Sequence, residues 1–375
     1  MNIGFILLNN HGGKGGMESV LEQTCMNLQK KGINSYVYLL YKPKHLEFLD
    51  KFQNIYYLSA PRYLEESSKL PRFAKKYLHK RYIQKNYDTL LKRMSDDHLD
   101  ALVVLNITKQ FLNHFDLLKQ FKDQNNVPLL SWTHSSISDT AKKILEQISK
   151  KASIFERHLA ISKAIKAEIY DVSRSKKISL TYNPISAAPK IQRDSKRFIF
   201  IGRIDKNKQV EELIQNFSKI KGDWSFDIYG STGSEESDQK IHQLIKSLEL
   251  DNKIFFHGWT ENPWTKINVA GTLLLNSKKE GLPLCIAEAM IRGIPCLSSN
   301  YFGEASEIIK NNENGWLYEI GDMKTWQSKV QAIVDGQLQL PDQESIQKSV
   351  LHFESAQVAE RFIDALNQTI KEYSN

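Results

Sequence analysis

The first forty residues, MNIGFILLNNHGGKGGMESVLEQTCMNLQKKGINSYVYLL (1–40), contain the pattern on which our fold prediction rests. An apolar run at 2–8 is followed by a glycine-rich turn. Apolar residues at helical spacing then continue to Gly32, and a second apolar run follows at 35–40. A strand, a crossover helix and a second strand in this order predict a parallel sheet covered by helices.

The same alternation continues along all 375 residues. Further strands are expected at 101–105, 129–133 and 158–161, with a helix at 163–170. The tract 186–196, rich in Ala, Pro, Lys and polar residues, predicts a linker. A second series follows it, with strands expected at 197–201, 225–229, 253–257, 271–275 and 294–298, and helices at 210–219, 237–248, 283–292 and 325–335. We therefore predict an α/β protein with an N-terminal domain over 1–185, a C-terminal domain over 186–345 and a C-terminal helical segment over 346–375. The sequence does not show which domain the last helix, 356–372, packs on.

The composition restricts the class of protein. Hydrophobic residues make up 41% and charged residues 25%, which fits a folded globular chain and excludes a disordered or fibrous one. Cys25, Cys285 and Cys296 are odd in number and widely separated, which argues against a disulfide framework and against a zinc knuckle. No apolar run approaches the ~20 residues of a membrane-spanning helix, and residues 1–8 lack the features of a signal peptide. We expect a cytoplasmic protein in a reducing compartment.

The positive charge is concentrated in one segment. The formal net charge is +8, and the stretch 69–93 alone has nine Lys or Arg against a single acid, Asp88. Phe73, Tyr77, Tyr82 and Tyr87 alternate with these cations. This composition suits the headgroups of an anionic membrane or a phosphorylated lipid-linked glycan, and it fits a solvated amphipathic helix equally well. No nucleic-acid motif accompanies the segment, so we expect no nucleic acid as partner.

A glycine-rich turn, His11-Gly12-Gly13-Lys14-Gly15-Gly16-Met17-Glu18, follows the first expected strand. Such a turn lets backbone N–H groups and a helix N-terminus approach a phosphate. It is not a P-loop, because no Gly-Lys-Ser/Thr follows, and Glu18 stands where a dinucleotide fingerprint has a small residue. The turn alone fits a flexible loop as well as a phosphate site.

Two cations follow the first strand of the second series. Arg203 and Lys208 lie just beyond 197–201, and the planar fork of Arg with the point charge of Lys suits a pyrophosphate. In isolation the pair favours a solvated loop. Opposite a glycine-rich loop on another domain, the phosphate interpretation is favoured.

The segment KKEGLPLCIAEAM (278–290) also follows an expected strand. Gly281 and Pro283 suit a turn into a helix with Pro in its first turn, which leaves backbone N–H groups for an anion or a sugar. Glu288 lies in an apolar stretch and, if buried, needs a partner such as a ribose diol. Spacing alone favours the interpretation that Glu280 and Glu288 are solvated or locally paired.

These residues together resemble a known family. The pattern Glu280-x7-Glu288 with Gly281 and Pro283 resembles the retaining nucleotide-sugar glycosyltransferases of family 4. The same resemblance is carried, from the first strand to about residue 335, by Gly15-Gly16-x-Glu18, Asn183-Pro184, Gly202-Arg203, Lys208, Tyr229-Gly230 and Asn314-Gly315. Segments 221–224, 256–264 and 308–310 are similar to the lipopolysaccharide 1,6-galactosyltransferases of that family, which use UDP-galactose.

The resemblance implies a GT-B architecture, in which two Rossmann-like domains face each other across a cleft and the C-terminal one holds the donor. By position, Arg203 and Lys208 would neutralise the diphosphate and Glu288 would bind the ribose. The donor sugar and phosphate would be held by Glu280 with the backbone of Gly281, Leu282, Pro283 and Leu284.

The N-terminal domain would complete the site. Gly15 and Gly16 would close over the phosphates, and His134, which follows the expected strand 129–133, matches the family's active-site histidine that contacts the donor hexose. His134 and Glu280 are therefore the expected catalytic residues, although a lone histidine is more often structural.

The resemblance implies departure of the nucleoside diphosphate and attack from the same face, with retention of configuration. Arg203, Lys208 and helix N–H groups could stabilise the leaving group without a metal. No Asp-x-Asp occurs in the chain, and the acidic cluster Asp96-Asp97-His98 with Asp100 is expected in a solvated turn. We expect no metal and no cofactor, with a UDP-sugar as co-substrate.

We therefore expect a retaining hexosyltransferase, cytoplasmic or peripheral on the inner face of the plasma membrane. It would move a hexose, galactose first, from a UDP-sugar to lipopolysaccharide or another lipid-linked or polysaccharide acceptor. One alternative is a UDP-glucose or UDP-N-acetylhexosamine transferase for capsule or cell-wall polymer. Another is a non-catalytic protein that binds anionic glycans or nucleic acid through 69–93. The sequence does not give the acceptor, the linkage or the oligomeric state.

Overall fold

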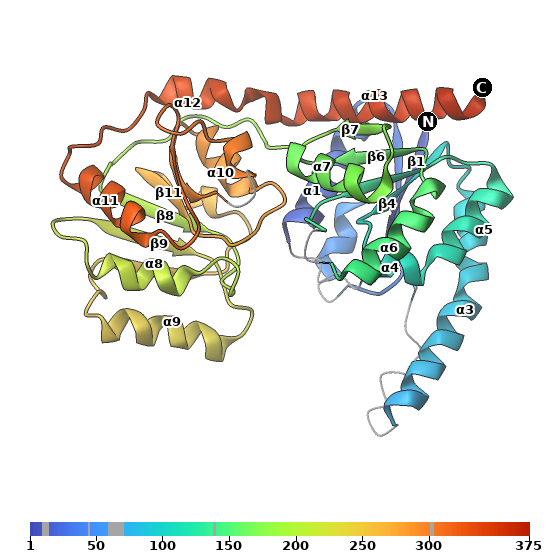
Figure 1. Cartoon of the computed structure of the whole chain (residues 1–375), viewed down its shortest axis with the longest axis horizontal. Coiled ribbons are helices and arrows are strands. Elements are labelled where there is room, and N and C mark those ends of the chain that lie inside the picture. The colour runs from blue at the N-terminus through green and yellow to red at the C-terminus, as the bar shows by residue number, and fades with distance from the viewer. Residues whose placement is uncertain (10–14, 44–45, 59–70, 138–139, 301–303) are drawn as a thin grey trace. The chain divides into compact units, whose positions relative to one another are not determined.

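The computed structural model describes residues 1–9, 15–43, 46–58, 71–137, 140–300 and 304–375. They form two compact units: unit 1 comprises residues 1–184 and 355–375, and unit 2 comprises residues 185–354 (Figure 1). Each unit contains a sheet whose strands all pair in parallel, with helices on its faces. The predicted α/β class with two parallel-sheet domains is confirmed.

The sheet of unit 1 has seven strands in the order β3-β2-β1-β4-β5-β6-β7. Their bounds are Asn2–Leu7 (β1), Asn34–Leu39 (β2), Asn54–Tyr57 (β3), Ala101–Leu105 (β4), Leu129–Thr133 (β5), Arg157–Ala160 (β6) and Ile178–Leu180 (β7). The five strands expected from the apolar runs are confirmed to within a residue at each end. The short edge strands β3 and β7 were missed, because neither is a buried apolar run.

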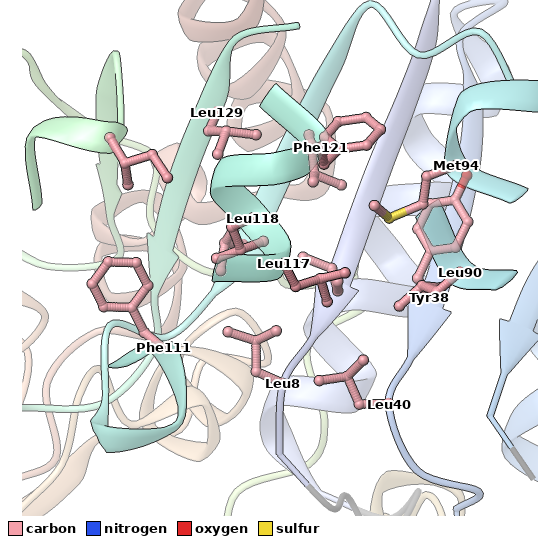
Figure 2. Packing of buried hydrophobic residues seen from close by; sticks show 14 of the residues in the cluster. Leu8, Tyr38, Leu40, Leu90, Met94, Phe111, Leu117, Leu118, Phe121 and Leu129 are labelled. Carbon is pink, nitrogen blue, oxygen red and sulfur yellow. The ribbon is translucent and has the colours of Figure 1, made fainter. Parts of the chain in front are cut away.

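Helices bury both faces of this sheet, as a parallel sheet requires. They are α1 (Gly16–Lys30), α3 (Arg72–Asp96), α4 (Lys109–Asn113), α5 (Phe115–Asn125), α6 (Lys142–Lys151), α7 (Lys163–Ser173) and α13 (Ser355–Ser374). Successive side chains of β1 point to opposite faces of the sheet. Phe5 stacks on Phe362 of α13 on one face. On the other face, Ile6 packs into a hydrophobic cluster with Leu90 of α3 and Leu118 of α5. Figure 2 shows this cluster.

The last helix packs on unit 1. In addition to Phe362, α13 presents Thr369 and Glu372 to the buried Arg157 of β6, with Nε to Oγ1 at 2.9 Å and Nη2 to Oε1 at 3.1 Å. A buried guanidinium needs such acceptors, so this contact answers the question that the sequence left open. Within the described ranges, no helix has both the length and the apolar character that a membrane crossing requires.

The sheet of unit 2 has six strands in the order β10-β9-β8-β11-β12-β13. Their bounds are Arg197–Ile201 (β8), Ser225–Tyr229 (β9), Ile254–Gly258 (β10), Thr272–Leu275 (β11), Cys296–Ser299 (β12) and Trp316–Tyr318 (β13). Its helices are α8 (Val210–Phe217), α9 (Glu235–Ser247), α10 (Leu284–Met290), α11 (Met323–Val334) and α12 (Gln343–Ser349). All five expected strands and four expected helices are present, whereas β13 and α12 were not expected.

Two tracts differ from the prediction: 186–196, predicted to be a linker within the C-terminal domain, and 346–354, predicted to lie outside it. The tract 186–196 is attached to unit 2, because Ile191 N–H donates to Arg292 O at 3.2 Å and Gln192 forms a bridge with Val269. Residues 346–354, expected to open a separate C-terminal segment, belong to unit 2 and include the end of α12. Only the helix that follows returns to unit 1.

Each sheet has a point at which the strand order reverses. In unit 1 the chain moves outward from β1 to β2 and β3 on one side and to β4 and its successors on the other. In unit 2 the same reversal falls between β8 and β11. The loops that follow the two central strands therefore diverge and leave a crevice at their carboxyl ends, where ligands of such sheets bind.

A buried histidine makes the stability of unit 1 sensitive to acid. His158 of β6 bonds Ser131 Oγ through Nδ1 at 2.7 Å, and burial lowers its pKa from 6.5 to about 4. The unfolded chain therefore binds a proton that the folded chain excludes, so stability falls as the pH drops from 6.5 to 4. His158→Gln, which keeps a neutral partner for Ser131, should remove about 3 kcal/mol of this loss. Urea unfolding of both proteins between pH 7 and pH 4 measures it, and parallel pH curves would contradict the assignment.

Candidate active site

The loop after β8 is a closed turn that carries two of the expected phosphate ligands. Asp205 Oδ1 accepts the backbone N–H groups of Asn207 and Lys208, each at 3.0 Å. Gln209 then adopts a left-handed conformation, with φ of 49°, and serves as the N-cap of α8. The carboxylate thus fixes the course of the loop before α8 begins.

The neighbouring loop after β9 lies against this turn. A Cβ atom on Gly230 would fall 2.0 Å from the carbonyl oxygen of Gly202. Gly230 N–H also donates to Gly258 O at 2.9 Å, so the residue cannot withdraw without losing a bond. Only glycine permits this approach of two backbones.

Lys208 and Glu280 join the two sides of the switch point in unit 2. Lys208 Nζ lies 2.5 Å from Glu280 Oε1, and both side chains are largely buried. Burial by itself would lower the pKa of Lys208, but the adjacent Glu280 carboxylate outweighs it and raises the pKa above its usual value. Lys208 therefore stays charged inside the protein.

Asn207 strengthens the same junction. Its side-chain Nδ2 donates to Lys279 O at 2.7 Å, and its carbonyl oxygen accepts Lys278 N–H at 2.8 Å. The loop after β8 and the loop after β11 are thus tied at three consecutive residues of the second loop, 278–280. Asn207 was not singled out from the sequence, although it precedes Lys208 directly.

Arg203 has a different environment from Lys208. Its side chain is 79% exposed, and its nearest acidic partner is Asp205, with Nη2 to Oδ2 at 3.7 Å. An ion pair of this length and exposure holds the guanidinium weakly. Arg203 can therefore turn to an anion without breaking a buried contact.

The residues after Glu280 lead directly into α10. Leu282 and Pro283 are buried, Gly281 is partly exposed, and Pro283 is the N-cap residue of a helix that starts at Leu284. Pro283 was expected inside the first turn, so the helix begins one residue later than the sequence indicated. Pro needs no N–H partner at this position.

Glu288 in α10 is held by a tryptophan. Trp264 Nε1 donates to Glu288 Oε2 at 3.2 Å. Burial raises the pKa of Glu288, while this hydrogen bond and the charge of Arg292 act in the opposite direction. The protein itself therefore supplies one partner for Glu288, whereas the sequence suggested a ribose diol. Trp264 had no sequence signal of its own beyond the similarity of 256–264.

In unit 1 the expected residues lie beside that sheet's switch point. Gly15 is the N-cap of α1 and Gly16 its first residue, whereas His11–Lys14 of the same turn lie outside the described residues. His134 follows β5, and its ring lies against that of Trp132, with centroids 4.2 Å apart and the ring planes inclined at 59°. These positions are where the topology places ligand groups.

Asn106 connects the two parts of this site. It follows β4 with φ of 64°, accepts His134 N–H on Oδ1 at 2.8 Å, and directs Nδ2 to Met17 Sδ at 3.3 Å. Asn106 thereby joins the start of α1 to the residue that follows β5. A polar residue directly after an apolar strand was a signal that the sequence analysis could have used.

The acidic cluster near β4 has structural partners. Asp97 accepts Tyr38 OH at 2.6 Å and pairs with Arg93, while Asp100 accepts the backbone N–H of Asn2 at 2.7 Å. Among the residues described here, no group of three or more His, Cys, Asp or Glu side chains is placed to hold a metal ion.

Known proteins share this fold and parts of this sequence. Residues 183–349 match the family model described as glycosyl transferases group 1. The chain is similar to the lipopolysaccharide 1,6-galactosyltransferase of Escherichia coli (strain K12), with 28% identity over 65% of this chain and 68% of the relative. The same enzyme of Salmonella typhimurium (strain LT2) is 31% identical over 58% of this chain and 61% of the relative.

Two solved structures extend the likeness to the whole fold. The lipopolysaccharide outer core galactosyltransferase WaaB, in its apo form, aligns with a TM-score of 0.77 and 23% identity, covering 98% of this chain and 99% of that one. Anabaena Alr3699/HepE in complex with UDP aligns with a TM-score of 0.76 and 17% identity, covering 98% and 100%.

Unit 2 therefore carries a glycosyl transferases group 1 domain, and the chain is a glycosyltransferase with the GT-B fold. Within that class, its named sequence relatives include lipopolysaccharide 1,6-galactosyltransferases. The resemblance to glycosyltransferases, and to lipopolysaccharide 1,6-galactosyltransferases among them, is confirmed.

The close approach at Gly230 can be tested directly. In Gly230→Ala the added methyl group meets Gly202 O, so the loops after β8 and β9 must separate. We expect a loss of about 1–3 kcal/mol in the free energy of unfolding and weaker UDP binding. Gly233→Ala on the same loop is the control: its methyl group meets no atom within 4 Å, but φ is 88°, so it should lose about 1–2 kcal/mol of stability through backbone strain alone and keep the wild-type UDP affinity. Wild-type stability and UDP affinity in Gly230→Ala would contradict the packing argument.

Proposed function

We propose that the chain is a retaining hexosyltransferase that uses a UDP-sugar, with galactose as the first choice of hexose and lipopolysaccharide as the first choice of acceptor. The observation that carries the proposal is the Lys208–Glu280 pair at the switch point of unit 2, with the exposed Arg203 on the same loop. A charged lysine that is largely buried between two loops can bind and neutralise a diphosphate. The galactosyltransferase relatives support the choice of sugar.

The donor roles follow from the chemistry of each group. Lys208 and Arg203 would neutralise the diphosphate, and one oxygen of Glu288 would accept a ribose hydroxyl. Glu280, already paired with Lys208, would hold the donor sugar together with the backbone of 281–284. We propose that this set works without a metal or cofactor, because two cations and backbone N–H groups can stabilise the leaving diphosphate.

Unit 1 would supply the remaining groups. Gly15 and Gly16, at the start of α1, would cover the phosphates with backbone N–H groups. His134, whose backbone is fixed by Asn106, would contact the hexose as the nucleoside diphosphate departs and the acceptor attacks from the same face. Retention of configuration follows from attack on the face that the leaving group vacates.

A second reaction class is favoured by other relatives. The chain is 26% identical, over 54% of its length and 42% of the relative, to the poly(ribitol-phosphate) alpha-N-acetylglucosaminyltransferase of Staphylococcus aureus (strain COL). A UDP-N-acetylhexosamine or UDP-glucose donor with a cell-wall or capsule acceptor is therefore the alternative. The non-catalytic interpretation predicts no nucleotide binding at all.

The acceptor is proposed to be lipid-linked or polysaccharide, reached from the cytoplasmic face of a membrane. Helix α3 carries most of the basic segment 69–93, and Arg81, Lys92 and Arg93 are exposed on it. Tyr77 is 64% exposed, whereas Tyr87 is buried with its hydroxyl 2.7 Å from His114 Nδ1. Tyr87 is therefore part of the hydrophobic core of unit 1. The membrane proposal rests on the basic residues of α3 together with the exposed Tyr77.

Calorimetric titration with UDP, UDP-galactose, UDP-glucose, UDP-N-acetylglucosamine and a GDP-sugar, with and without a chelator, tests the donor site. We expect chelator-insensitive binding that is selective for a UDP-sugar. Glu288→Ala should weaken UDP binding by about tenfold or more, because a hydrogen bond to a charged group is lost. His134→Ala should leave UDP affinity nearly unchanged and lower the turnover number.

The outcomes separate the alternatives. Selective binding of UDP-glucose or UDP-N-acetylglucosamine would support the second reaction class. Absence of binding to every nucleotide would overturn the enzyme site, and equal loss of affinity and turnover in both variants would overturn the assigned roles.

Vesicle binding tests the role of α3. We compare the wild type with a variant in which four basic residues of the helix are neutralised, K75Q/R81Q/K85Q/K92Q. Each cation near an anionic surface contributes about 1 kcal/mol, so binding to phosphatidylglycerol vesicles should fall at least about tenfold.

The matched control removes the same charge elsewhere. Exposed lysines on four other helices are neutralised in K119Q/K150Q/K240Q/K348Q, which should bind vesicles as the wild type does. Equal binding by the α3 variant and the wild type would refute membrane attachment through this helix.

A further inference from the structure

Trp264 lies in a short turn that fixes its direction. The turn, η4 (Pro263–Thr265), follows β10, and Asn262 caps it by accepting Trp264 N–H on Oδ1 at 3.2 Å. From this position the indole Nε1 reaches Glu288 Oε2 on α10 at 3.2 Å. Two segments that are 24 residues apart in the sequence therefore meet at one carboxylate.

Arg292 holds the tryptophan from another side. Its guanidinium carbon lies 4.3 Å from the centroid of the Trp264 ring, which is a cation–π contact. Its Nη1 also donates to the backbone oxygen of Glu288 at 2.7 Å. Trp264, Glu288 and Arg292, which we call the Trp264 cluster, thus form a closed set of contacts. The cation–π contact and the hydrogen bond together restrain the indole ring.

The two carboxylate oxygens of Glu288 differ in their hydrogen bonds. Oε2 accepts the indole N–H, whereas Oε1 has no hydrogen-bond partner within the described part of the chain. Glu288 is only partly buried, and Oε1 is not one of the buried side-chain atoms that lack a partner, so this oxygen is accessible from outside the protein. Oε1 is therefore the oxygen that a ligand hydroxyl can satisfy.

We propose that Trp264 is a positioning residue for the nucleotide: it fixes Oε2 of Glu288 so that Oε1 is left to accept a ribose hydroxyl. The inference rests on the proposed function, which assigns the ribose to Glu288. Trp264 acts through the carboxylate and needs no contact with the ligand. Its indole N–H has a second effect, because it favours the ionised form of the group that it orients.

The charged and titratable groups around Glu288 set the sign of a pH effect. Burial raises the pKa of Glu288, the Trp264 hydrogen bond and the charge of Arg292 lower it, and the buried Cys285 thiol lies on the same helix. UDP binding should weaken as the pH falls through this raised value, because the protonated form is a poorer acceptor. Loss of the indole N–H should move that transition to higher pH.

Titration of UDP into the full chain between pH 5 and pH 8.5 tests the proposal. Trp264→Phe keeps an aromatic ring for Arg292 and removes only the N–H, so the midpoint of the acid transition should rise by about one pH unit. Trp326→Phe makes the same change at a fully buried site in α11 and should leave the midpoint unchanged. The terminal phosphate of UDP titrates equally in all variants, so the comparison between variants is unaffected.

Glu288→Gln separates failure of this inference from failure of the proposed function. The amide cannot ionise, so the protein-dependent part of the acid transition should disappear. If Glu288→Gln binds UDP as the wild type does at every pH, the ribose assignment itself is wrong. If Glu288→Gln loses the transition but Trp264→Phe keeps the wild-type midpoint, only the role of Trp264 is overturned. A uniform loss of affinity at all pH values in Trp264→Phe would likewise show a structural role alone.

Discussion

The ion pair between Lys208 and Glu280 constrains the loops at the switch point of unit 2. A buried ammonium group without a partner is strongly destabilising, and the same holds for a buried carboxylate. Because one group comes from the loop after β8 and the other from the loop after β11, neither loop can move alone. The hydrogen bonds of Asn207 and the missing side chain at Gly230 complete this junction. A fixed positive charge consequently lies where two parallel strands diverge.

Two residues of the candidate site, Glu288 and Asn106, are held in conformations or surroundings that cost stability. Glu288 is held in surroundings that raise its pKa, and its carboxylate has a single side-chain donor among the described residues. Proteins keep such groups where a ligand compensates for them, at some loss of stability. In unit 1, Asn106 adopts a left-handed backbone conformation, and its Oδ1 accepts the backbone N–H of His134. Both features lie beside a switch point, as the topology requires of a ligand site.

The fold and the site were predictable to different extents. The central strands are buried on both faces and read as apolar runs, so β1, β4 and β8 were found, whereas the short strands β3, β7 and β13 were not. Glycine and charge patterns singled out Lys208, Glu280 and Glu288 as candidates, and the family resemblance gave their expected roles. Trp264 and Asn106 escaped because each acts through a contact between distant segments, and no local spacing encodes such a contact. The course of 186–196 along unit 2 escaped for the same reason.

A crystal structure of the full chain with UDP tests the central claim most directly, because it locates every atom of the nucleotide against these residues. We expect the diphosphate beside Lys208 and Arg203 and a ribose hydroxyl on Glu288 Oε1, with Trp264 Nε1 still bonded to Oε2. A nucleotide bound away from the loops after β8 and β11, or a ribose with no contact to Glu288, would contradict it.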